Sequence, residues 1–181
     1  MHTFKYFKKQ ATTGQVDVDY LLTYQFLDRG GFPPSYVDFA SQLGWGRLSG
    51  LFLVYVPLGQ YSDSWLVQSP KIKQYMNGFY KDIQHDTFLL EPDGYEGIEV
   101  SLVPFAMSEN GQYLAWDTSK RDRSGEFPIY VLAARLGGIR YGAKDLYQFV
   151  EKYANDADVK TALGPGYNKL PLTFEPLPIS T

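Results

Sequence analysis

The chain has 181 residues, of which 44% are hydrophobic and 17% aromatic, enough apolar material for one compact domain. A formal net charge of −3 argues against a general nucleic-acid binder, and the absence of cysteine excludes a disulfide framework and any cysteine-ligated zinc site. The longest apolar stretch, residues 51–58, is too short to span a membrane, and the N-terminus lacks the apolar core of a signal peptide. We therefore expect a single domain over residues 1–181, located in the cytoplasm and not associated with a membrane.

The first half of the chain predicts three helices and one strand. Apolar residues at helical spacing predict a helix over residues 17–27. A second helix is expected to begin near Pro34, because proline is tolerated in a first turn. Residues 52–56 form a short apolar run typical of a central strand. A third helix is expected to begin at Ser69, with Pro70 at its first position. Its apolar stripe consists of Ile72, Tyr75, Met76, Phe79 and Ile83.

The middle of the chain predicts an antiparallel meander. Asn110 and Gly111 both tolerate the positive φ of a two-residue type I′ turn, which makes them the strongest hairpin signal. Apolar and polar side chains alternate over residues 98–102 before this turn, and Trp116 after it is expected to be buried. Residues 127–133 are rich in β-branched and aromatic side chains and supply a third strand.

The C-terminal part predicts two helices and an extended arm. A closing helix begins near Ala143, and a shorter one covers residues 156–163. The closing helix is expected to bury Leu146, Phe149, Val150 and Tyr153. Four prolines exclude regular helix from residues 164–181, where alternating apolar residues favour an arm packed on the domain over a segment that binds a partner. Helices that flank an antiparallel sheet give an α+β fold.

Three sequence blocks carry a family resemblance. Residues 32–39 read Phe-Pro-Pro-Ser-Tyr-Val-Asp-Phe, with Gly-Trp-Gly at 44–46. Residues 108–117 read Ser-Glu-Asn-Gly-Gln-Tyr-Leu-Ala-Trp-Asp, with Phe-Pro-Ile-Tyr-Val at 127–131, and residues 143–151 read Ala-Lys-Asp-Leu-Tyr-Gln-Phe-Val-Glu. In this order the blocks resemble the SMI1/KNR4 family, also called the SUKH superfamily, over about residues 16–154.

Motifs for catalysis and for cofactors are sparse. The chain has two histidines, His2 and His85, and it lacks a Gly-x-Ser-x-Gly elbow, a His-x-x-x-His pair, a P-loop and a dinucleotide fingerprint. We therefore expect no catalytic residue, no metal and no cofactor. An enzyme that uses His85 or a carboxylate is the alternative, and it would lose activity when that residue is changed.

An acidic run is the most pronounced charge feature. It contains no Lys or Arg, and its six carboxylates are Asp82, Asp86, Glu91, Asp93, Glu96 and Glu99. Such a surface attracts a basic partner, although a charge run is also typical of a solvated surface without a partner. Trp65 follows the polar residues 61–64 and is expected to be an exposed anchor beside the acids. The basic loop at residues 119–124 is expected to be a solvated hairpin tip.

The resemblance implies a function for this acidic domain. Bacterial members of the family are largely immunity proteins that bind and neutralise a cognate toxin, often a nuclease. We therefore expect a basic protein toxin as the partner, bound through the six carboxylates and Trp65, and no direct contact with nucleic acid. Fungal members of the family regulate cell-wall synthesis. A regulatory or scaffold module, or a carbohydrate-binding domain that uses exposed aromatic residues, is therefore the alternative.

Overall fold

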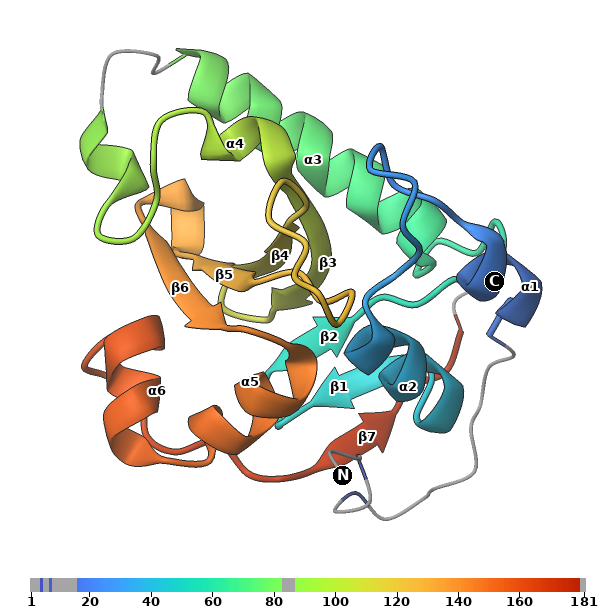
Figure 1. Ribbon diagram of the computed structural model, residues 1–181. Helices are drawn as coiled ribbons and strands as arrows, with labels where there is room; N and C mark the ends of the chain where they lie inside the picture. Colours follow the sequence, from blue (N-terminus) through green and yellow to red (C-terminus); the bar gives the residue numbers. More distant parts are fainter. Residues whose placement is uncertain (1–3, 5–6, 8–15, 83–86, 180–181) are drawn as a thin grey trace.

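The computed structural model describes residues 4, 7, 16–82 and 87–179, which fold into a seven-stranded antiparallel sheet covered by helices (Figure 1). The predicted α+β class is confirmed. The elements in chain order are α1 (Val18–Thr23), α2 (Pro34–Gln42), β1 (Gly46–Leu48), β2 (Phe52–Val54), α3 (Trp65–Asp82), η1 (Thr87–Leu90), α4 (Ile98–Ser101), β3 (Leu102–Ser108), β4 (Tyr113–Asp117), β5 (Ile129–Leu132), η2 (Ala134–Leu136), β6 (Ile139–Ala143), α5 (Leu146–Tyr153), α6 (Asp156–Leu163) and β7 (Phe174–Pro176).

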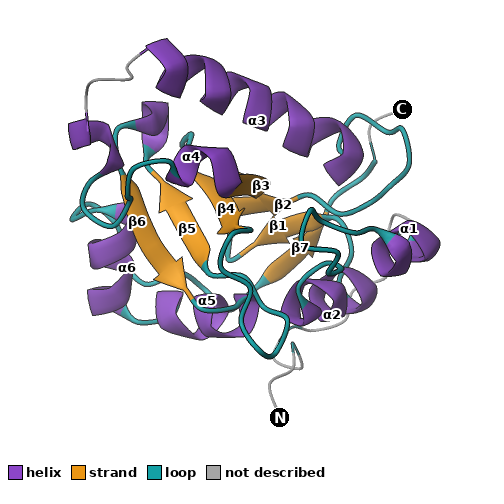
Figure 2. Cartoon of the chain, turned by 45° about the horizontal axis from the view of Figure 1, so that its top comes forward, coloured by secondary structure: helices purple, strands orange, loops and turns teal. Residues whose placement is uncertain are grey.

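The sheet has the strand order β6-β5-β4-β3-β2-β1-β7, in which every neighbouring pair is antiparallel. The strands β3, β4 and β5 are consecutive in the chain and adjacent in the sheet, so the predicted meander is confirmed. Helices α3 and α4 lie on one side of the sheet, and α2 and α5 lie on the other (Figure 2). Two layers of helices therefore enclose the sheet, and its central strands are buried on both faces.

The hairpin between β3 and β4 forms at the predicted place with a different turn. The Gly111 amide donates to the Ser108 carbonyl at 3.1 Å, and the Ser108 amide donates to the Gln112 carbonyl at 2.8 Å. Gly111 has φ +86°, whereas Asn110 does not have a positive φ. The loop therefore has three residues, with the single left-handed position at Gly111, and the predicted two-residue type I′ turn is wrong.

Two predicted element boundaries are also wrong. Residues 98–101 form the short helix α4 instead of strand, which leaves Val100 76% exposed. Helix α3 begins at Trp65 instead of Ser69, because Ser64 caps it. The Ser64 hydroxyl accepts from the Leu66 amide at 3.3 Å, and the Ser64 carbonyl accepts from the Gln68 amide at 2.8 Å.

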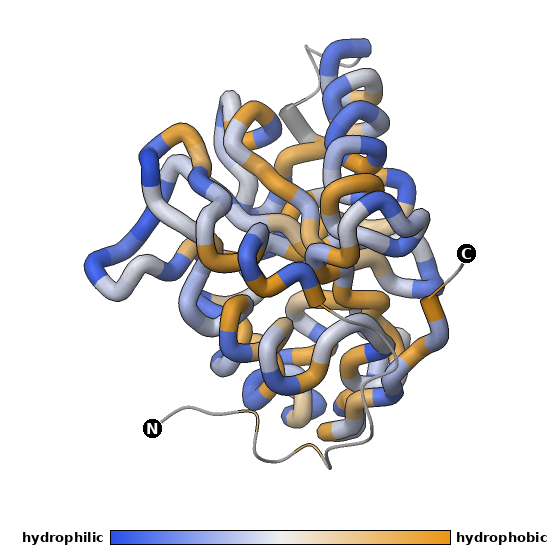
Figure 3. The backbone as a smooth tube through the Cα atoms, turned by 90° about the vertical axis from the view of Figure 1, so that its right-hand side faces the viewer, coloured by the Kyte–Doolittle hydropathy of each residue, from blue (hydrophilic) through white to orange (hydrophobic). Residues whose placement is uncertain are grey.

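Helices α3 and α1 differ from their predictions in different ways. Of the expected stripe on α3, Ile72 and Met76 are buried and Tyr75 is half exposed, while Ile83 lies outside the described residues. In Figure 3 the α3 tube alternates between hydrophobic and hydrophilic colours, as expected for a helix with one buried face. Helix α1 is shorter than predicted. It ends where Tyr24 turns to an extended backbone and stacks on Phe32 with ring centroids 4.9 Å apart.

The aromatic core lies between α2 and the middle of the sheet. Trp116 is 1% exposed, as predicted, and stacks on Phe105 with ring centroids 4.3 Å apart. Tyr36 of α2 packs edge-on against Trp116 at 4.8 Å and donates its hydroxyl proton to the Tyr55 carbonyl at 2.7 Å. This core joins the early helix to the central hairpin.

A buried polar contact at Ser35 joins α2, α5 and the segment before β5. The Ser35 amide and hydroxyl donate to the two oxygens of Glu126 at 2.7 and 2.8 Å, and the Leu146 amide donates to the Ser35 hydroxyl at 3.1 Å. Burial raises the pKa of Glu126, although the hydrogen bonds from Ser35 act in the opposite direction. Blocks far apart in the sequence therefore meet at one point.

The C-terminal part follows its prediction except at the start of the closing helix, because residues 139–143 form strand β6 and α5 begins at Leu146 instead of near Ala143. Helix α5 buries Leu146, Phe149, Val150 and Tyr153, as expected. Beyond α6, β7 pairs with β1 and completes the edge of the sheet. Phe174 of β7 is buried edge-on against Phe39, with ring centroids 5.5 Å apart. The described part of the arm is thus packed on the domain.

Candidate functional site

The described carboxylates of the acidic run lie along two connected segments. Asp82 is exposed at the C-terminal end of α3. Glu91, Asp93 and Glu96 are exposed between η1 and α4, and Glu99 is half buried on α4. The end of α3 and the segment from η1 to α4 lie at the same end of the molecule (Figure 1). Asp86 and His85 lie outside the described residues.

The segment that carries Glu91 and Asp93 is fixed to the sheet edge. The Ile139 amide donates to the Glu91 carbonyl, and the Asp93 amide donates to the Ile139 carbonyl, both at 3.0 Å. The Asp93 carboxylate accepts from the Tyr141 amide at 2.8 Å. Asp93 therefore holds the loop against β6, whereas the Glu91 and Glu96 side chains are exposed on it.

The fold also brings cations to the acidic run, which contains none in sequence. The Lys120 ammonium lies 3.8 Å from the centre of the Tyr95 ring and 3.6 Å from an Asp117 oxygen. The Lys73 ammonium donates to the carbonyl oxygens of Glu99, Val100 and Leu102. Burial lowers the pKa of Lys73 to about 8, and the nearby Glu99 carboxylate acts in the opposite direction. The acidic surface is therefore interrupted near α4.

The prediction that Trp65 is an exposed anchor is wrong. Trp65 is 4% exposed and packs edge-on against Phe32 and Tyr24, with ring centroids 4.9 and 5.2 Å away. The polar residues before it form the turn that leads to the Ser64 cap. Trp65 occupies the first turn of α3 and faces inward, so its polar sequence neighbours did not indicate its own exposure.

The basic loop is exposed at residues 119, 120 and 122–124, as predicted, but Arg121 within it is packed against the domain. Arg121 forms an ion pair with Asp28 and donates to the carbonyls of Gly125 and Gly31 at 2.7 and 2.8 Å. Its guanidinium lies 3.9 Å from the centre of the Phe127 ring. Arg121 therefore holds this loop to the segment before α2, and its charge is used inside the fold.

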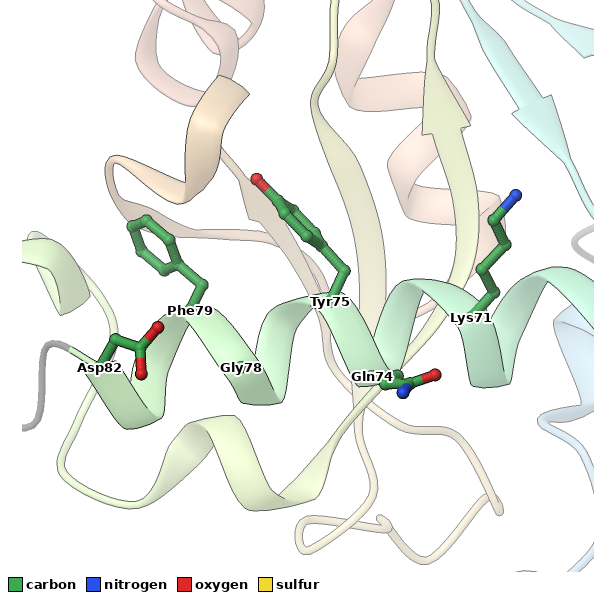
Figure 4. Close-up of a pocket in the computed structure, with 6 residues that line it drawn as sticks. All are labelled: Lys71, Gln74, Tyr75, Gly78, Phe79 and Asp82. Carbon is green, nitrogen blue, oxygen red and sulfur yellow. The ribbon is translucent and has the colours of Figure 1, made fainter.

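A groove along α3 was not predicted from the sequence. It has a volume of about 500 Å³ and is lined by Lys71, Gln74, Tyr75, Gly78, Phe79 and Asp82. Tyr75 and Phe79 project from the same side of α3, while Gly78 contributes no side chain (Figure 4). Tyr75 is 50% exposed, and its ring centroid lies 6.4 Å from that of Tyr113 on β4. The helical spacing of Tyr75 and Phe79 is visible in the sequence, but it predicts a buried stripe and not the wall of an exposed groove.

A smaller hollow lies on the other flank of α3, next to α4. It has a volume of about 250 Å³ and is lined by Asn77, Tyr80, Lys81, Glu99 and Val100. We call the surface formed by the linings of the groove and of this hollow the α3–α4 face. The groove contributes the half-exposed Tyr75 and Phe79 side chains with Asp82, and the hollow on the other flank contributes Glu99, which are the kinds of apolar and charged side chains that protein interfaces use.

Other kinds of site receive no support from the geometry. Among residues 4, 7, 16–82 and 87–179, no three His, Asp or Glu side chains are grouped so that they could hold a metal ion. No helix in this described part is long and apolar enough to cross a membrane. No protein-family model, no curated protein and no solved structure matches the chain.

Proposed function

We propose that the chain is a non-enzymatic protein-binding domain of the SMI1/KNR4 type, an immunity protein that neutralises a cognate toxin by covering its active groove. The observation that carries this proposal is the α3–α4 face. Its groove offers the half-exposed Tyr75 ring, and Asp82 and the exposed Glu91 and Glu96 lie at the same end of the molecule. A basic protein surface complements this combination.

The positions of the resemblance blocks support the proposal. Tyr36 of the first block packs on Trp116 of the second, and Ser35 of the first block accepts a hydrogen bond from Leu146 of the third. The residues that carry the resemblance therefore hold the fold together. Partner choice then falls to surface residues outside these blocks, such as those of the α3–α4 face.

The charges favour a basic partner. Carboxylates on one end of the molecule accelerate encounter with a cationic surface and mimic the phosphate charge that a nuclease groove binds. Lys71 and Lys81 on the same face limit which basic surfaces fit, because like charges brought together in an interface are repelled. The toxin is therefore expected to present its cations opposite Asp82, Glu91 and Glu96.

A carbohydrate-binding module, for example one that serves cell-wall synthesis, is the second candidate. The groove that contains the half-exposed Tyr75 ring is also lined by the polar side chains of Gln74 and Asp82. A groove lined by an aromatic ring and by polar side chains is a suitable platform for a sugar ring. Trp65, which is buried, cannot take this role.

Affinity capture from the lysate of the native cells tests the proposal. The tagged chain is the bait, the binding buffer contains little salt, and the captured proteins are identified by mass spectrometry. We expect recovery of one basic protein in equal proportion to the bait, and we expect that this protein arrests growth when it is expressed without the chain. Retention on a polysaccharide column that disappears in Tyr75→Ala would instead favour the carbohydrate module.

A further inference from the structure

The hollow between α3 and α4 contains two buried polar atoms that have no hydrogen-bond partner among the described residues. They are the hydroxyl oxygen of Tyr80 and Oε2 of Glu99. Both side chains line the hollow, and Tyr80 is only 6% exposed. Buried polar groups are nearly always hydrogen-bonded, because an unsatisfied one has lost its hydrogen bonds to water without replacing them. A ligand that carries donors and reaches these two oxygen atoms from the hollow would satisfy both.

The ammonium of Lys73, which bonds to the backbone carbonyl of Glu99, does not satisfy the Glu99 carboxylate oxygen Oε2. The ammonium of Lys73 donates to the backbone carbonyls of Glu99, Val100 and Leu102, which terminate α4. An ammonium group has three protons, so these three bonds use all of its donors. Lys73 thus fixes the end of α4, and the Glu99 carboxylate oxygen stays available.

We propose that this hollow, the Glu99 pocket, receives the guanidinium group of an arginine side chain from a partner protein. A guanidinium has five N–H donors in one plane, enough to reach the Glu99 carboxylate, the Tyr80 hydroxyl oxygen and the Asn77 amide oxygen together. It is also less strongly hydrated than an ammonium, so it enters a small hollow at lower cost. The inference depends on the proposed function, because it names one contact made by the toxin.

The charge of Lys81 is expected to lower the affinity of the pocket for arginine. Its exposed side chain lines the same hollow and repels a second cation. We therefore expect opposite effects from two substitutions in the pocket. Glu99→Gln removes the counter-charge and weakens binding about tenfold, whereas Lys81→Gln removes the repulsion and strengthens binding about threefold.

The test is a nuclear magnetic resonance titration of the full chain with Nα-acetyl-arginine amide. The expected result is a saturable shift of the backbone amide signals of Asn77, Tyr80, Lys81, Glu99 and Val100. Nα-acetyl-citrulline amide is the matched control probe, because it has nearly the same shape without the charge. Nα-acetyl-lysine amide tests the preference for a planar donor group, and we expect it to bind several-fold more weakly.

The variants separate binding from folding. Glu99→Gln, Tyr80→Phe and Lys81→Gln are titrated only after their spectra show the native dispersion, and at least Lys81→Gln, at an exposed position, is expected to keep it. Equal shifts with the citrulline probe, or arginine affinity unchanged in both Glu99→Gln and Lys81→Gln, would overturn the inference. A captured toxin that binds Glu99→Gln as tightly as wild type would overturn it too, while the proposed function would stand. Arginine binding without any captured toxin would remove the proposed function and keep the pocket.

Discussion

Ser35 illustrates how single residues hold this fold together. Replacing it with alanine removes the hydroxyl, which donates to the buried Glu126 carboxylate and accepts from the Leu146 amide. The backbone amide of residue 35 can still donate to Glu126. We expect Ser35→Ala to lower the free energy of unfolding by about 3 kcal/mol, because a buried charge loses a partner. Urea denaturation measures this loss. Ser62→Ala, at an exposed position, is the control and should change stability by less than about 0.5 kcal/mol.

The Asp117 carboxylate makes the free energy of unfolding depend on pH in the acid range. Burial raises its pKa, but hydrogen bonds from Ser119, Tyr95 and Ser101 outweigh burial, so the folded-state pKa lies below the ordinary value of 3.8. The unfolded chain then binds the proton first as the pH falls. The stability that Asp117 contributes is complete above 3.8 and is lost as the pH falls through the folded-state pKa. Asp117→Asn is expected to cost about 2 kcal/mol at neutral pH and to flatten the stability profile below pH 4.

Glu126 is the comparison for Asp117, because its pKa is shifted in the opposite direction and its effect on stability has the opposite pH dependence. Its folded-state pKa is raised by burial above the ordinary 4.5, so the folded chain holds the proton longer as the pH rises. Its contribution to stability therefore decreases as the pH rises from 4.5 through the folded-state pKa. Glu126→Gln should lack this decrease. Unfolding curves with the same pH dependence in Asp117→Asn, Glu126→Gln and wild type would contradict both assignments.

Residue-level prediction from the sequence succeeded for Trp116 and failed for Trp65. Trp116 lies on the central strand β4, whose residues 114–117 are all buried, so its burial did not depend on which face of the sheet it occupies. Trp65 follows polar residues, and its burial depends on Ser64 starting a helix at that point. A single serine gives a weak signal for a helix start, so the direction of Trp65 could not be derived from its neighbours.

At the level of elements, a substitution at Gly78 in α3 is expected to change both stability and partner binding. A Cβ added at Gly78 would meet no atom within 4 Å, so packing within the described chain does not require glycine there. Glycine in a helix interior is less favourable than alanine by about 1 kcal/mol. We expect Gly78→Ala to stabilise the fold by about that amount and to weaken partner binding, because the methyl group enters the groove. Thermal unfolding and a binding measurement on the same samples check both effects.

Gly46 in β1 is the control for this substitution. A Cβ there would lie 2.3 Å from the Glu175 carbonyl oxygen of β7, so Gly46→Ala should destabilise the edge of the sheet. A stabilised Gly78→Ala variant that binds its partner with unchanged affinity would show that the groove is not part of the interface.

Strands and long amphipathic helices were predictable, but short elements were not. The meander follows from the hairpin signal at Asn110 and Gly111 and from the β-branched and aromatic run at residues 127–133, and α5 follows from a period of 3.6 residues. Helix α4 has four residues, too few for a helical period to appear, and its alternation over 98–102 favoured strand. Strands β1 and β7 have three residues each and are strands because they pair with each other.

For the whole molecule, the sequence predicted the fold class and the acidic run better than the α3–α4 face. The α+β class follows from element types alone. The α3–α4 face requires the packing of α4 beside α3, and neither the groove nor the Glu99 pocket has a sequence signature. The cations that interrupt the acidic run, Lys73 and Lys120, come from other parts of the chain.

We propose that the carboxylates at the end of α3 and on the segment from η1 to α4 bind a basic partner. Reversing the charge of two of them is the direct test of this proposal. The measurement is the association rate of the captured partner with wild type, with Glu91→Lys/Glu96→Lys and with Asp19→Lys/Glu151→Lys, each at several salt concentrations. The two double variants change the net charge equally, but the second pair lies on α1 and α5. We predict that salt slows association with wild type, that the first variant associates at least tenfold more slowly and that the second stays within about threefold of wild type. Equal rates for the two double variants would contradict the account.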